Sequence, residues 1–106
     1  MNINEFAVKV HENAKNKGWH NNTVSPLEFH ALFHSEISEA TEEVRNGKDY
    51  LYFEDRVPKG EAVELADVVI RIADYFSSKG WNLEQILQFK MDYNETRSFR
   101  HGNKCY

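Results

Sequence analysis

The stretch from residue 61 to residue 79, EAVELADVVIRIADYFSSK, constrains the fold of this chain more than any other segment. Written on an α-helix, its apolar side chains cover almost the whole circumference. A helix that is apolar on most sides is stable only when other elements bury it. Because the chain has 106 residues, we expect one domain, residues 1–106, in which the other elements pack around this helix.

Apolar periodicity and capping residues predict three more helices, over residues 3–17, 26–45 and from 83 to at least 94. Ser25 and Asn82 are residue types that cap helix N-termini, and Pro26 suits a first helical position. The segment 48–60 is longer than most connections in helical bundles, and its YLYF is the only strand candidate. We therefore predict an all-α fold, a bundle of four to five helices.

Four polar residues interrupt the apolar surface of the segment 61–79, namely Glu64, Asp67, Arg71 and Asp74. Their spacing, i, i+3, i+7 and i+10, stacks them in one narrow stripe. Such a stripe forms either the solvent-facing edge of an amphipathic helix or a polar seam inside a bundle. The small width of the stripe on a helix this apolar makes the seam a real alternative.

The segment 26–45 carries a similar acidic face, formed by Glu36, Glu39 and Glu43 at i, i+3 and i+7. If the two helices fold antiparallel, Glu36 and Glu39 can meet the acidic pair of the next helix. Four carboxylates that converge without a counter-ion repel one another and take up protons. A hard divalent cation removes that conflict, and Mg²⁺ prefers oxygen ligands. The competing interpretation is two exposed acidic helix faces.

Other metal sites fit the sequence less well. A di-iron bundle needs Glu-x-x-His, and no histidine here has a glutamate three positions before it. His30 and His34 are spaced i, i+4, as in zinc sites, but the chain contains no His-Glu-x-x-His motif. We expect packing or surface roles for these two histidines.

Charge and composition exclude several classes of function. The net charge of −4 argues against a nucleic-acid polymer as partner, because such proteins carry a basic footprint. No apolar run approaches the roughly 20 residues of a membrane span, so we expect no membrane partner. The single cysteine, Cys105, has no partner in the chain, which indicates a reducing compartment. We expect a cytoplasmic protein.

The acidic motifs resemble those of a known family, the MazG-like all-α nucleoside triphosphate pyrophosphohydrolases. The family signature is Glu-x-x-Glu, a spacer, then Glu-x-x-Asp, and here it reads Glu36-Ile-Ser-Glu39 and Glu64-Leu-Ala-Asp67. The surrounding SEISEA, KGEAVELADVVIRIADY and KMDYNETRSFRHGNK are also similar to the family. The resemblance covers roughly residues 26–104, with residues 48–56 unmatched.

The resemblance implies hydrolysis of a nucleoside triphosphate, a dNTP or a non-standard nucleotide, between the α and β phosphates. Glu36, Glu39, Glu64 and Asp67 would hold Mg²⁺, with Mn²⁺ as a substitute. The metal would neutralise the polyphosphate and lower the pKa of a bound water. Glu39 is the proposed catalytic residue that takes the proton of this water.

The substrate itself needs polar and aromatic contacts. Lys90, Asn94, Arg97 and His101 share one face if the last helix persists, and the family points to Lys90 and Asn94, with Arg97, as nucleotide contacts. Basic groups near a helix C-terminus also suit its dipole. Trp19 is the favoured platform for the base; otherwise it packs the first helix onto the bundle.

Two features concern partners. The helix over residues 61–79 is apolar on more sides than three short helices can cover, which predicts a homo-oligomer. The family resemblance implies a dimer or a dimer-of-dimers tetramer, in which a neighbouring chain contributes to each site. Two other functions stay open, a non-catalytic helical module that binds nucleotide or metal and a purely structural interaction protein.

Overall fold

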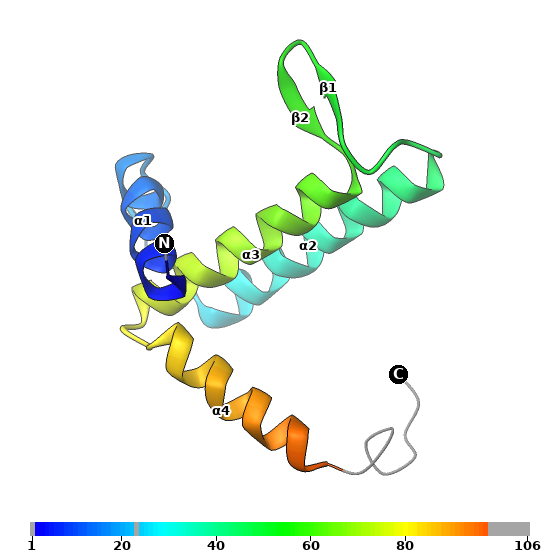
Figure 1. Cartoon of the computed structure of the whole chain (residues 1–106). Helices are drawn as coiled ribbons and strands as arrows, with labels where there is room; N and C mark the ends of the chain where they lie inside the picture. Colours follow the sequence, from blue (N-terminus) through cyan, green and yellow to red (C-terminus); the bar gives the residue numbers. More distant parts are fainter. Residues whose placement is uncertain (1, 23, 98–106) are drawn as a thin grey trace.

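The computed structural model describes residues 2–22 and 24–97 (Figure 1). Their elements are, in chain order, α1 (Ile3–Asn16), α2 (Pro26–Arg45), β1 (Tyr52–Glu54), β2 (Val57–Lys59), α3 (Glu61–Ser78) and α4 (Leu83–Thr96). The four predicted helices are confirmed, close to the predicted bounds. Among these residues no helix has the length and apolarity needed to cross a membrane. His101 and Cys105 lie outside the described residues.

The predicted caps are in place. The side chain of Ser25 accepts the backbone N–H of Glu28 at the start of α2, and that of Asn82 accepts the backbone N–H of Gln85 at the start of α4. At α1, Asn2 and Glu5 form a reciprocal capping box. These local bonds satisfy N–H groups that a helix leaves unpaired at its N-terminus, so they fix where each helix begins.

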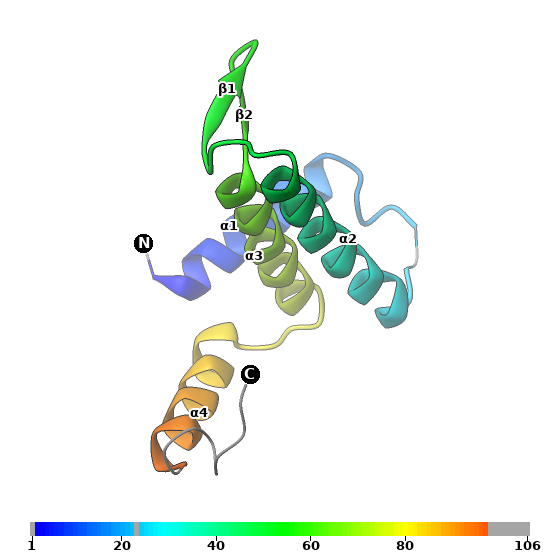
Figure 2. The same ribbon diagram turned by 90° about the vertical axis from the view of Figure 1, so that its right-hand side faces the viewer.

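Helix α3 is the centre of the packing, as its apolar circumference predicts. Figures 1 and 2 show α2 lying antiparallel along α3, while α1 packs across the C-terminal half of α3. The core where α1, α3 and α4 meet contains Ala7, Ala73 and Leu83, with Phe6 and Phe76 packed against it. Small residues at this contact allow the helices to approach closely.

A β-hairpin lies between α2 and α3, where the sequence predicts a connecting loop. Its strands pair antiparallel, with Tyr52 opposite Lys59 and Glu54 opposite Val57. The turn residues Asp55 and Arg56 both have positive φ, 50° and 68°, which is the geometry of a two-residue hairpin turn. This hairpin corrects the expectation of a purely helical chain. The described part of the chain is mostly helical, with four helices and one small hairpin.

Gly60 joins the hairpin to α3. Its φ is +119°, and a Cβ at this position would collide with the backbone carbonyl of Tyr50. The backbone N–H of Ala62 donates to that same carbonyl. Glycine is therefore required for the hairpin to return onto the first turn of α3, beside the acidic residues of that helix.

Among the described elements, helix α4 packs by its beginning against α1 and the end of α3, and then diverges from the α2–α3 pair (Figures 1 and 2). Its side chains Phe89, Met91 and Tyr93 are exposed. The radius of gyration is 16.3 Å, against about 13 Å for a compact domain of this length. A single copy of the chain thus leaves much apolar surface uncovered.

The predicted basic face of the last helix is shorter than expected. Helix α4 ends at Thr96, and Arg97 is its C-cap residue with extended backbone, ψ 148°. Lys90 and Asn94 lie on the helix, whereas Arg97 lies beyond its last turn. The helical spacing used to group these residues with His101 therefore does not hold through Arg97.

Candidate functional site

The antiparallel pairing of α2 and α3 brings carboxylates of both helices together. Ligand oxygens of Glu36, Glu64 and Asp67 all lie within 4.8 Å of one another. Glu36 is 7% exposed, and the other two are half-buried. The polar stripe of α3 therefore forms a seam against α2 here, and the alternative of a fully solvent-facing edge is wrong for these residues.

Glu39, the fourth predicted ligand, lies at the exposed rim of this cluster. Glu39 nevertheless contributes to the raised pKa values of Glu36 and Glu64. Three predicted residues thus share the cluster, and the fourth borders it from the solvent side. Glu43 is engaged separately, because the Tyr52 hydroxyl donates to its two oxygens at 2.8 and 3.0 Å.

The crowded carboxylates perturb one another. Burial, then the hydrogen bond with Glu39 and the charges of Glu39, Glu36 and Asp67, raise the pKa of Glu64 to about 7. Burial also raises the pKa of Glu36, against the opposing effect of Arg71. Each added negative charge in this seam disfavours the next ionisation. Glu64 therefore keeps its proton to a higher pH than an isolated glutamate does, unless a cation takes the place of that proton.

Arg71 partly supplies that cation. Its Nε donates to Oε1 of Glu36 at 2.9 Å, with 27% of the arginine side chain and 9% of the glutamate side chain exposed. The second oxygen, Oε2 of Glu36, is buried and has no hydrogen-bond partner among residues 2–22 and 24–97. A buried unpaired carboxylate oxygen is costly. The potential ligand atoms of Glu36, Glu64 and Asp67 are all carboxylate oxygens. Such a set suits a hard divalent cation such as Mg²⁺.

A pocket adjoins the cluster on the other side of Arg71. It has a volume of about 330 Å³ and is lined by Trp19, Val24, Phe29, Leu32, Phe33, Arg71 and Asp74. The Arg71 guanidinium lies 5.2 Å from the centre of the Trp19 ring, in cation–π geometry. Trp19 is 46% exposed, so it lines this pocket rather than filling the core.

A second hollow lies below the hairpin. It is bordered by Glu39, Glu64, Tyr52 and Lys48, among other residues of α2 and the connection after it. Lys48 is the cation that lines it. The hydroxyl of Tyr52 is bound to Glu43, and this hydrogen bond raises the pKa of Tyr52 to about 12. Tyr52 therefore supports Glu43 and the hairpin.

The predicted substrate contacts on α4 lie apart from the cluster in a single chain. The Lys90 ammonium and the Arg97 guanidinium sit over the Tyr93 ring, at 5.1 and 5.5 Å from its centre. Asn94 is exposed on the same helix. Neither the pocket beside Trp19 nor the hollow beside Lys48 is lined by a residue of α4.

Sequence reasoning missed two features of this region. It placed Arg71 in the polar stripe but gave it no partner, although its position one turn from Asp67 was a usable signal. It gave no role to Lys48, since only the hairpin brings that residue beside the cluster. Comparison of the chain with protein-family models, curated proteins and solved structures finds no match.

Proposed function

We propose that the protein is a Mg²⁺-dependent nucleoside triphosphate pyrophosphohydrolase of the MazG-like type, acting on a dNTP or a non-standard nucleotide. The observation that carries this proposal is the convergence of Glu36, Glu64 and Asp67, with Glu39 at the rim. The raised pKa of Glu64 and, among the described residues, the unpaired oxygen of Glu36 support a site that positive charge beyond that of Arg71 would stabilise. A metal with its polyphosphate substrate would meet that need.

Glu36, Glu64 and Asp67 would hold Mg²⁺, with Mn²⁺ able to substitute. When bound, the metal supplies positive charge for the polyphosphate and lowers the pKa of a coordinated water. Glu39 borders the cluster on its exposed side, where a water molecule can reach it. We assign to Glu39 the role of general base, because proton transfer needs a carboxylate within hydrogen-bond reach of that water.

The pocket beside Trp19 suits the base. Its volume of about 330 Å³ lies at the lower end of small-ligand sites, and aromatic side chains line much of it. Arg71 joins this pocket to the carboxylates through its bond to Glu36. A nucleotide with its base against Trp19 would therefore direct its phosphates past Arg71 towards the acidic cluster.

A homo-oligomer would complete the site. Lys90, Asn94 and Arg97 do not line the site of their own chain, whereas α4 exposes apolar side chains along most of its length. We infer that α4 packs on another copy, in a dimer or a dimer-of-dimers tetramer. These three residues would then contact the nucleotide bound to the neighbouring chain.

The test is a panel of nucleoside triphosphates with Mg²⁺, scored for monophosphate and pyrophosphate. Glu39→Gln and Asp67→Asn should abolish pyrophosphate release while the helical signal in circular dichroism stays intact. Glu84→Gln, an exposed acid at the start of α4, is the matched control and should keep full activity. Unchanged turnover in both site variants would contradict the proposal, and nucleotide binding without any pyrophosphate would favour a non-catalytic binding module.

A further inference from the structure

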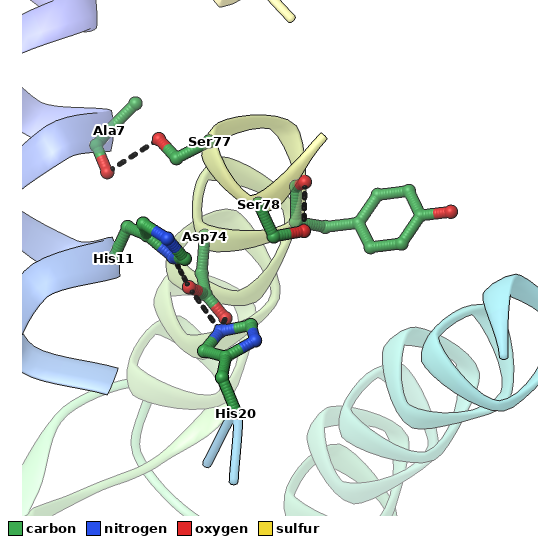
Figure 3. A network of polar contacts seen from close by, with 7 residues as sticks. Ala7, His11, His20, Asp74, Ser77 and Ser78 are labelled. Carbon is green, nitrogen blue, oxygen red and sulfur yellow. Dashed lines mark hydrogen bonds and ion pairs between the residues drawn. The ribbon is translucent and has the colours of Figure 1, made fainter. Parts of the chain in front are cut away.

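A second group of metal-ligating side chains lies outside the acidic cluster, and Figure 3 shows it from close by. Nδ1 of His11 lies 2.7 Å from Oδ1 of Asp74, and Nε2 of His20 lies 2.8 and 2.9 Å from its two oxygens. The two imidazole rings meet edge to face, with 4.8 Å between their centres. Three potential ligand atoms thus gather within 4.8 Å of one another.

The three residues come from three separate parts of the fold. His11 is on α1, His20 is on the turn after α1, and Asp74 is on α3. The turn is fixed by Gly18, with φ +81°, and by the bond from the Trp19 N–H to the Ala14 carbonyl. This turn places His20 against α3, so the three ligands are contributed by two helices and a hydrogen-bonded turn.

Asp74 is the most buried charged residue in the described part of the chain, at 3% exposure. Within that part, its ion-pair partners are the two histidines, and neither Lys nor Arg bonds to it. A carboxylate this buried needs compensation for its lost hydration. Two imidazole N–H groups provide hydrogen bonds, and a metal ion bound in their place would provide a full positive charge.

Two imidazole nitrogens and one carboxylate oxygen are the donor set of Zn²⁺ sites that keep one position open. The same set discriminates against Mg²⁺, which prefers oxygen ligands. An open position is available, because Asp74 borders the pocket beside Trp19, and His11 borders a separate hollow of about 410 Å³. A water molecule or an added ligand atom can therefore reach the cluster.

We propose that His11, His20 and Asp74 form a binding site for Zn²⁺ or a similar transition-metal ion, separate from the acidic cluster. On binding, each coordinating nitrogen presents its lone pair to the metal in place of an N–H. A neutral imidazole then carries its proton on the other ring nitrogen, and an imidazolium releases one proton to solvent. This inference does not depend on the proposed hydrolase activity.

Such a site has a structural consequence for this chain. The core between α1 and α3 is built largely on alanines, and no large side chain in the described residues is fully buried. A metal held by α1, its following turn and α3 would join these elements directly. Because the metal binds only the folded arrangement, it would raise the melting temperature by mass action.

The experiment titrates Co²⁺ and then Zn²⁺ into the chelator-treated full chain, in excess Mg²⁺ to occupy the acidic cluster. A Cys105→Ser background removes the free thiol as a ligand. We expect one equivalent of Co²⁺ with the intense visible absorption of a four-coordinate site, displaced by Zn²⁺. His20→Ala and Asp74→Asn should weaken binding by at least about 100-fold, since loss of even an outer-shell partner costs 10–100-fold.

His30→Ala and His34→Ala are matched controls, because both histidines are exposed on α2. They should leave the Co²⁺ absorption unchanged, as should Glu64→Gln. The proposal is overturned if the intact chain binds no stoichiometric Co²⁺ or Zn²⁺, a result that does not depend on any variant folding. It is also overturned if the absorption survives in His20→Ala or disappears in Glu64→Gln.

Discussion

Replacing Glu64 by glutamine should stabilise the metal-free protein at alkaline pH. The folded-state pKa of Glu64 is about 7, above its ordinary value of 4.5, because burial and three neighbouring carboxylates oppose its ionisation. Between these two values the folded state binds more protons than the unfolded state, so stability falls as the pH rises. Glutamine cannot ionise, so the stability of the variant does not fall for this reason as the pH rises.

The pKa shift of Glu64 sets the size of the expected stabilisation. A displacement from 4.5 to about 7 corresponds to at most ~3 kcal/mol of unfolding free energy. Glu64 is only half-buried, and solvent screening reduces the expected gain to ~1–2 kcal/mol. For a domain of this length each kcal/mol moves the melting temperature by roughly 4–8 °C. Glu64→Gln should therefore melt several degrees above the parent protein at about pH 8.

The assay is thermal unfolding by circular dichroism at fixed protomer concentration, with chelator, from about pH 5 to about pH 8. The advantage of Glu64→Gln should be nearly absent at the acid end, where Glu64 is protonated in both states, and should grow through neutrality. Adding Mg²⁺ should stabilise the parent more than the variant. A variant that melts lower than the parent at every pH would refute the reasoning, since Glu64 would then be a stabilising charge.

Three further predictions test other parts of the structure. Gly60→Ala should lower the free energy of unfolding by ~2–4 kcal/mol, because a Cβ collides with the Tyr50 carbonyl. Gly47→Ala, with open space around it, should cost only ~1 kcal/mol. Equal losses for the two variants in urea denaturation would contradict the role given to Gly60. Trp19→Ala should raise the KM for the nucleotide severalfold, whereas Trp81→Ala, which loses edge contacts with Tyr75 and Phe76, should lower stability with KM unchanged. Light scattering should give a mass of two or more times the 12.5 kDa of one chain. Phe89→Asp, on the exposed face of α4, should lower that mass. A parent protein of 12.5 kDa in solution would exclude the oligomer.

The helices could be predicted because their signals are local. At the starts of α2 and α4, the side chains of Ser25 and Asn82 accept backbone N–H groups, and Pro26 has no N–H to satisfy. The apolar period is read from neighbouring residues alone. The meeting of Glu36 with Glu64 and Asp67 followed from one added assumption, that consecutive helices fold antiparallel. The structure confirms that assumption.

The features that sequence reasoning missed depend on contacts distant in the chain or on unusual turns. The hairpin turn uses Asp55 and Arg56, not the Asn-Gly or Asp-Gly that marks such turns, so its strands looked like a loop. His20 bonds to Asp74 across 54 positions, and no periodicity links them. The divergence of α4 likewise depends on how its first turn packs on α1, through the bond from the Glu84 N–H to Asn4.

In the proposed site, carboxylates of α2 and α3 share one divalent cation. The most direct measurement is Mn²⁺ binding followed by electron paramagnetic resonance, with Mn²⁺ in place of Mg²⁺. To exclude the histidine cluster, the titration is run on the parent protein, on His20→Ala and on the double variant Glu36→Gln/Asp67→Asn. We predict saturable binding to the parent and to His20→Ala, and its loss in the double variant. Binding that persists in the double variant, or that is absent from the parent, would contradict the claim.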